Sequence, residues 1–235
     1  MNQTFMKEKK ILPLVLSMSL PMVLSMLVNS LYNIIDSYFV AKISENAMTA
    51  LSLVYPLQIL INAVAVGLGI GLNTAASFYL GAQDHEKADD AASLGMVLSV
   101  IHGLVLTFIC ILIVPSFLHL FTQDESVISY ALTYSYIVFA FTTPITISIA
   151  MEKVFQAEGQ MVITMTTMLC GCITNIILDP IFIFGLGPVP EMGIAGAAWA
   201  TGIGQVVPMR LYFIIYLKKP LPLRLRIRKG MFDRK

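Results

Sequence analysis

Long apolar runs separated by short polar stretches follow one another along the whole 235-residue chain. Six of these runs hold at most one Asp, Glu, Lys or Arg each, over residues 11–41, 46–83, 91–123, 126–151, 159–190 and 192–217. A helix that crosses a bilayer needs about 20 consecutive, mostly apolar residues. The pattern predicts an all-α, polytopic membrane protein, a six-helix transmembrane bundle with spans at about 11–41, 47–80, 91–114, 127–150, 161–185 and 193–217.

Composition narrows the class further. The chain is 57% hydrophobic and 12% charged, whereas a soluble domain carries about 25% charged residues. This excludes a soluble globular enzyme, a disordered chain and a nucleic-acid binder, and leaves membrane lipid as the surrounding partner. The three cysteines, Cys110, Cys170 and Cys172, all lie in apolar runs and have no disulfide or zinc-ligand spacing. We find no catalytic motif and expect neither an enzyme nor an organic cofactor.

The basic residues predict the orientation. Six spans place both termini on one side, and that side receives thirteen of the fifteen Lys and Arg residues. The opposite side has Lys42 alone, and Arg210 lies inside the last span. By the positive-inside rule, we expect a multi-pass protein of the cell membrane (plasma or inner) with both termini cytoplasmic. The basic tail, 218–235, suits either an anionic inner leaflet or a plain stop-transfer flank.

Prolines interrupt five of the six predicted helices. Pro21 in the first and Pro180 in the fifth are candidate kink positions, because proline removes one backbone hydrogen bond from a helix. Kinked bundles are frequent among transporters, although receptors and channels have them too. The prolines therefore favour moving helices without naming a function.

Two acids inside spans are the candidate functional residues, because a charge in the bilayer is costly. Asp36 lies about 9 Å of helix from Lys42, and Asp179 is also in the outer half of its span. Asn175 is one turn before Asp179, and Thr201 lies at a similar depth in the last span. These four side chains form an all-oxygen set, which suits a proton or a small hard cation such as Na⁺.

A structural alternative stands beside this interpretation. Asp36 could be an interfacial residue that reaches the headgroups or Lys42, and Asp179 could cap a short final segment before Pro180. Spacing alone does not show that the two acids touch. Met22 and Met26 with Tyr32 are candidates for an adaptable substrate cavity, against the alternative that methionines simply face lipid.

Several ordered stretches resemble the multidrug and toxic compound extrusion (MATE) transporters. SLPMVLSMLVNSLYNIIDSYFVAKI resembles the family's first helix, AVGLGIGLNTAASFYLGAQDHEKA its second helix and following turn, and FQAEGQ the turn after its fourth helix. TNIILDPIFIFGLG and GIAGAAWAT resemble its fifth and sixth helices. The resemblance covers residues from about 10 to 217.

The resemblance implies an antiporter that exports small, organic, often cationic compounds while Na⁺ or H⁺ enters. It assigns cation binding to the positions matching Asp36, Asn175, Asp179 and Thr201, and it places Tyr32 in the substrate cavity. The family has twelve helices in two lobes, whereas this chain has one lobe followed by what resembles the start of the inter-lobe linker. Gln83 also stands where the family often has Gly.

The single lobe leaves three interpretations open: a missing second lobe, a homodimer partner in its place, or an inactive, truncated membrane component that transports nothing. A lipid-linked sugar flippase of the same superfamily fits less well, because only Arg210 lies in a span to meet a pyrophosphate.

Overall fold

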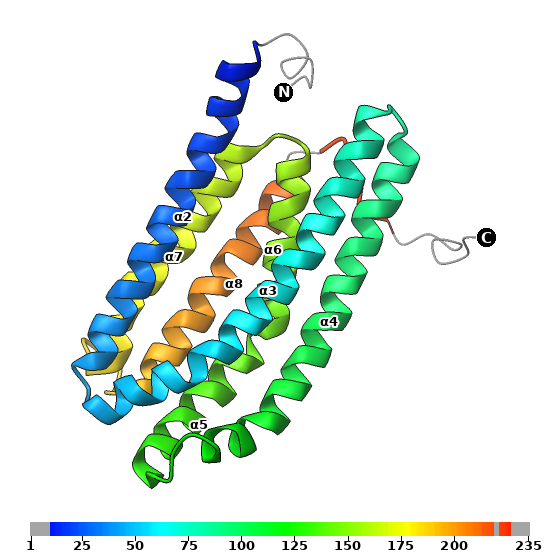
Figure 1. Ribbon diagram of the computed structural model, residues 1–235. Helices are drawn as coiled ribbons and strands as arrows, with labels where there is room; N and C mark the ends of the chain where they lie inside the picture. The colour runs from blue at the N-terminus through cyan, green and yellow to red at the C-terminus, as the bar shows by residue number, and fades with distance from the viewer. Residues whose placement is uncertain (1–9, 219–220, 227–235) are drawn as a thin grey trace.

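A computed structural model describes residues 10–218 and 221–226 of the chain. The regular secondary structure of this part is all α-helix, as the sequence predicts, and its helices run side by side as one bundle (Figure 1). The helices are α2 (Ile11–Ala41), α3 (Glu45–Gly81), α4 (His85–His119), α5 (Glu125–Ala140), α6 (Thr142–Ala157), α7 (Met161–Phe184) and α8 (Ile194–Lys218). We call the end of the bundle where α2 begins and α8 ends the terminal end, and the other end the opposite end.

Five single helices of the described chain, α2, α3, α4, α7 and α8, are long and apolar enough to cross a membrane. The fourth expected span, 127–150, differs from a single helix, because α5 and α6 meet at Phe141 with a bend of 45°. Pro144 lies in the first turn of α6 and cannot donate to the last carbonyls of α5, which accounts for the break. Together α5 and α6 make a sixth candidate span.

Helix α6 also extends past the expected end of that span. It continues to Ala157, so Glu152, Lys153 and Gln156 are helical residues. The sequence had placed them in a connection between spans. Their side chains are partly buried at the terminal half of the bundle.

Polar side chains begin three of the helices at the points where the chain turns. The hydroxyl of Ser44 accepts from the Ala47 N–H at α3 (3.0 Å), and Asp84 Oδ1 accepts from the Lys87 N–H at α4 (3.2 Å). Asp124 accepts from the N–H groups of Ser126 and Val127 at α5. Each cap satisfies donors that the first turn of a helix leaves without partners.

Helices α7 and α8 approach each other closely because glycines face the contact. A Cβ atom at Gly171 would overlap Pro208 and the carbonyl of Gly204 across the interface. A Cβ at Gly204 would in turn lie 3.0 Å from the Cβ of Asn175. Small residues allow such an approach in a membrane, where no hydrophobic force drives helices together. The packing brings Asn175 against α8.

A short non-helical segment, residues 221–226, packs against the terminal end of the bundle and is called the strap. Leu221 and Leu223 are buried in a core cluster with Leu72, Phe155 and Tyr212. Four backbone N–H groups of the strap donate to side chains of the bundle: Leu223 to Glu158 Oε1 (2.9 Å), Arg224 to Asp89 Oδ1 (2.7 Å), Leu225 to Tyr216 Oη (2.7 Å) and Arg226 to Ser93 Oγ (2.8 Å). The rest of the expected 218–235 tail, apart from Lys218, lies outside the described residues.

Candidate functional site

The two acids expected inside the spans meet in the half of the bundle at the opposite end. Asp36 comes from α2 and Asp179 from α7, and both side chains are buried. The two carboxyl groups are close enough to interact electrostatically. Neither acid has an ion pair in the part of the chain that the structure describes. A buried carboxylate without a cationic partner is costly, so this pair of acids is an unusual feature of the bundle interior.

Asn175 lies beside this pair on the same face of α7. Its Nδ2 donates to Asp179 Oδ1 at 3.2 Å, one helical turn away. Its own Oδ1 is buried and accepts no hydrogen bond. The side chain thus holds one acid in place while its carbonyl oxygen remains available.

Thr201 joins the group from α8. It borders, with Asp36 and Tyr32, a cavity of about 400 Å³ that is also lined by residues of α3 and α5. Tyr134 of α5 lines the same cavity, and its hydroxyl accepts a hydrogen bond from Gln58 Nε2 at 3.4 Å. Tyr32, one turn before Asp36, lies near Gln205 of α8 and near both acids.

Buried oxygen atoms without partners converge here. Within the described chain, six buried side-chain oxygens make no hydrogen bond: Asp36 Oδ1, Asn175 Oδ1, Asp179 Oδ2, Thr201 Oγ1, Ser135 Oγ and Thr142 Oγ1. Four of these six belong to the four residues that the sequence singled out. Buried polar groups are nearly always paired in native proteins, so a cluster of orphaned oxygens is exceptional, and its chemistry allows it to accept a cation or a proton.

The donor set defines the chemistry of that ligand. Carboxylate, amide and hydroxyl oxygens are hard ligands, which suit Na⁺, and a carboxyl pair suits a proton. No group of three His, Cys, Asp or Glu side chains able to hold a metal ion occurs among the residues described. Asp36 and Asp179 are the only ionisable acids among the four residues of the cluster.

Met26 does not share this location. Its side chain is 67% exposed and it is not part of the cavity wall. Met26 lies ten residues, or about 15 Å of helix, before Asp36 on α2, and this distance along the helix separates it from the cavity. Tyr32, at about 40° from Asp36, stays on the cavity face. Pro21 and Pro180 both lie inside continuous helices, α2 and α7.

Sequence reasoning missed Tyr134, Gln58 and Gln205 as neighbours of the site. Each is an uncharged polar residue inside an apolar run, and that was the signal available. Their convergence on Asp36 and Thr201 depends on how α3, α5 and α8 pack, which spacing within one helix does not reveal.

Comparison with known proteins identifies relatives over nearly the whole chain. Multidrug export protein MepA of Staphylococcus haemolyticus (strain JCSC1435) is 30% identical over 216 residues, which cover 92% of this chain and 47% of the relative. MepA of Staphylococcus aureus (strain MRSA252) is 26% identical over the same length. The chain spans about half the length of these curated relatives.

Solved structures give the same picture. The structure of MATE in complex with MaD5 superposes with a TM-score of 0.85 at 29% identity, covering 92% of this chain and 48% of that one. A MOP superfamily transporter from Pyrococcus furiosus Vc1 superposes with a TM-score of 0.84 at 28% identity, covering 94% and 49%. The MatE family model matches residues 21–181. Because that match takes in more than half of a multi-pass helical chain, the protein belongs to the MatE family of membrane transporters, as the resemblance of its motifs had indicated.

Proposed function

We propose that this chain forms one lobe of a secondary antiporter that exports organic cations in exchange for Na⁺ or H⁺. The coupling cation binds at Asp36, Asn175, Asp179 and Thr201. The observation that carries the proposal is the convergence of unpaired, buried oxygens from these four residues. The relatives called multidrug export proteins support the export of drug-like molecules.

Binding of the cation couples to movement through the helices that supply its ligands. Asp36 belongs to α2, whereas Asp179 and Asn175 belong to α7, so a cation between the acids draws these two helices together. Without a cation, two buried negative charges repel each other. The bound ion favours one arrangement only to the extent that it binds that arrangement more tightly. Pro21 in α2 provides the point at which that helix can bend.

The cavity beside the cation site has the lining expected for an organic cation. Tyr32, Tyr55 and Tyr134 present aromatic rings, and Gln58 and Ser52 add polar groups. Aromatic faces attract cations, and a nearby carboxylate strengthens that attraction. A substrate cation and the coupling cation therefore compete for the same negative charge, which is the basis of exchange.

The orientation and assembly complete the proposal. We place both ends of the chain, and with them the terminal end of the bundle, in the cytoplasm, since thirteen of the fifteen basic residues belong to that side of the predicted topology. A second six-helix lobe, or a second copy of this chain in the same orientation, supplies the other half of the pathway. The half-length match to the relatives supports such a partner.

The test is the substitution Asp36→Asn in the full natural protein, reconstituted in liposomes with an inwardly directed cation gradient. We expect loss of gradient-driven ethidium export with unchanged membrane insertion, because Asn cannot offer a charge to the cation. Glu191→Gln, which removes an exposed carboxylate at the same end, is the matched control and should export normally. Normal export by the Asp36→Asn protein would refute the proposal, and a wild-type protein that exports nothing would favour an inactive component.

A further inference from the structure

A second layer of polar side chains lies inside the bundle, nearer the terminal end. Ser25, Thr164 and Tyr212 are all buried, and they lie eleven residues from Asp36, Asn175 and Thr201 in that order. Eleven residues make about three turns, or about 16 Å of helix, so each member of the second layer is on the same helix face as its counterpart. Helices α2, α7 and α8 thus present polar groups to the bundle interior at two levels.

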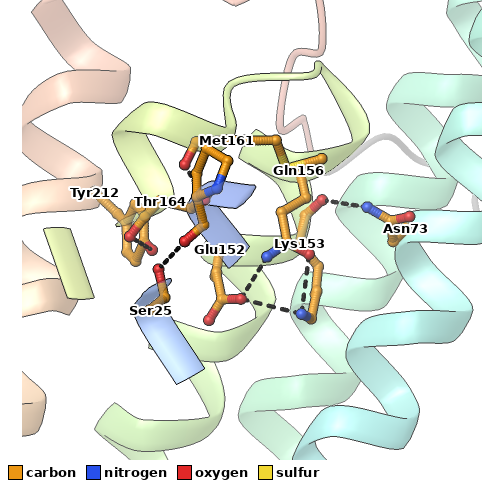
Figure 2. Close-up of polar contacts among 9 residues, drawn as sticks. Ser25, Asn73, Glu152, Lys153, Gln156, Met161, Thr164 and Tyr212 are labelled. Carbon is orange, nitrogen blue, oxygen red and sulfur yellow. Dashed lines mark hydrogen bonds and ion pairs between the residues drawn. The ribbon is translucent and has the colours of Figure 1, made fainter. Parts of the chain in front are cut away.

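Helix α6 adds charge to this second layer (Figure 2). Lys153 Nζ donates to Glu152 Oε1 at 3.0 Å and to Gln156 Oε1 at 2.9 Å, and Gln156 Nε2 donates to the same Glu152 oxygen at 2.6 Å. Both contacts therefore fall on one oxygen of Glu152. Figure 2 shows the other carboxylate oxygen pointing away from Lys153 and Gln156. Figure 2 draws Glu152 in one group with Ser25, Thr164 and Tyr212, which come from α2, α7 and α8.

Helix α3 is shaped to hold Lys153. Asn73 Nδ2 donates to the backbone carbonyl of Lys153 at 2.9 Å. The aliphatic stem of Lys153 passes over Gly69, where an added Cβ would lie 2.8 Å from the Lys153 Cγ. Gly69 lies eleven residues after Gln58, which lines the cavity beside Asp36. The ion pair is thus seated in a prepared position, with side-chain exposures of 13% for Lys153 and 22% for Glu152.

We propose that Glu152 is a second cation-binding site, which the coupling cation occupies on its way between the Asp36–Asp179 pair and the cytoplasm. This inference rests on the function proposed above. The ligand is a monovalent cation, either Na⁺ or H⁺. It is bound by the carboxylate oxygen of Glu152 that points away from Lys153 and Gln156. Lys153 occupies Glu152 when no cation is present, and Gln156 Oε1 holds the ammonium group when the cation arrives.

Competition from Lys153 explains how the Glu152 site releases its cation. A carboxylate alone in a membrane protein interior would hold a cation tightly, whereas a tethered ammonium group competes for it at every moment. Release toward the cytoplasm requires weak binding, and Lys153 provides that weakness. An ion pair inside a membrane protein is also costly to keep, which favours a functional role over a passive one.

The experiment compares Glu152→Gln, Lys153→Met and the double variant in the full natural protein reconstituted in liposomes. Uptake of ²²Na⁺ and of protons, followed with a trapped pH dye, distinguishes the two cations. We expect Glu152→Gln to slow cation-driven ethidium export about tenfold and to weaken cation binding from the cytoplasmic side. We expect Lys153→Met to act in the opposite direction on binding, with a lower Kd and slower release.

The double variant should behave like Glu152→Gln, because Lys153 acts only through Glu152. Lys87→Met, which breaks the exposed pair with Asp84 at the same end, is the matched control and should leave both readouts unchanged. A purely structural clasp predicts that both single variants lose thermal stability and activity alike and that the double variant restores them, which would overturn the proposal. If the Glu152→Gln protein binds cations and exports normally while the Asp36→Asn protein does not, the proposed site at Glu152 is refuted and the site at Asp36 and Asp179 is retained.

Discussion

The amide of Asn175 donates to Asp179 one turn further along α7, at 3.2 Å, and leaves its own carbonyl oxygen buried without a donor. One side chain thus performs two tasks: it fixes the orientation of an acid and adds a neutral oxygen to the same group. A carboxylate at this position would add charge, and an apolar residue would do neither.

Replacing Asn175 with Ala should therefore weaken binding of the coupling cation by about tenfold, since one ligand and one orienting hydrogen bond are lost together. The measurement is the cation concentration that gives half-maximal ethidium export. Asn62→Ala is a suitable control, because Asn62 also lies in an apolar helix but bonds only the carbonyl of Gln58, one turn before it. Equal effects of the two substitutions would argue against a role for Asn175 at the site.

The hydroxyl of Thr201 can be separated from its shape. Thr201→Val keeps the volume and removes the buried, unpaired Oγ1, whereas Thr201→Ser keeps the oxygen. If the oxygen binds the cation, the Val variant loses cation affinity by a few fold and the Ser variant retains it. The same half-maximal export assay decides between them, and identical behaviour of Val and Ser would remove Thr201 from the ligand set.

Close approach of α7 and α8 makes Gly171 sensitive to any side chain. Gly171→Ala places a methyl group against Pro208 and the backbone of Gly204, which should cost about 1–3 kcal/mol of stability through forced repacking. The check is the thermal unfolding of the purified protein in detergent. Gly67→Ala is the control, since a Cβ there meets nothing within 4 Å, and it should unfold at the wild-type temperature.

Asp124 links stability to pH outside the membrane. Its pKa lies below the ordinary value of 3.8, because the Ser126 hydroxyl and then the N–H groups of Val127 and Ser126 donate to the carboxylate. Since the folded value is lowered, this stabilisation is present above pH 3.8 and is lost as the pH falls through the lower folded value. Asp124→Ala should lower the melting temperature at pH 7 and narrow its gap to wild type as the pH falls below that range. A gap that stays constant with pH would exclude the carboxylate as the cause.

The fold class was predictable because the signal is local. Apolar runs of bilayer length, separated by charged turns, required no knowledge of how the helices pack. The bend at Phe141 was harder to predict, because prolines such as Pro21 and Pro180 lie inside continuous helices while Pro144 follows a break. Whether a proline ends a helix depends on its neighbours in the bundle.

The site divides in the same way. Asp36 and Asp179 were found because a charge in an apolar run is rare, and Asn175 because it is one turn from an acid. Tyr134 and Gln58 were not, because their role depends on α3 and α5 meeting α8. Glu152 and Lys153 were assigned to a polar connection since charges usually end a span, and only the continuation of α6 to Ala157 places them in the interior.

The strap over the terminal end is held through its main chain. The groups that donate to Glu158, Asp89 and Ser93 are amides, which nearly every amino acid possesses. Apart from the buried Leu221 and Leu223, the side chains of the strap can therefore change without loss of these hydrogen bonds. Proline is the exception, because it has no backbone N–H. Mutational scanning should find that Arg224 and Arg226 tolerate every substitution that keeps a backbone N–H. The exposed side chains of the strap can therefore vary in evolution while the strap stays attached to the bundle.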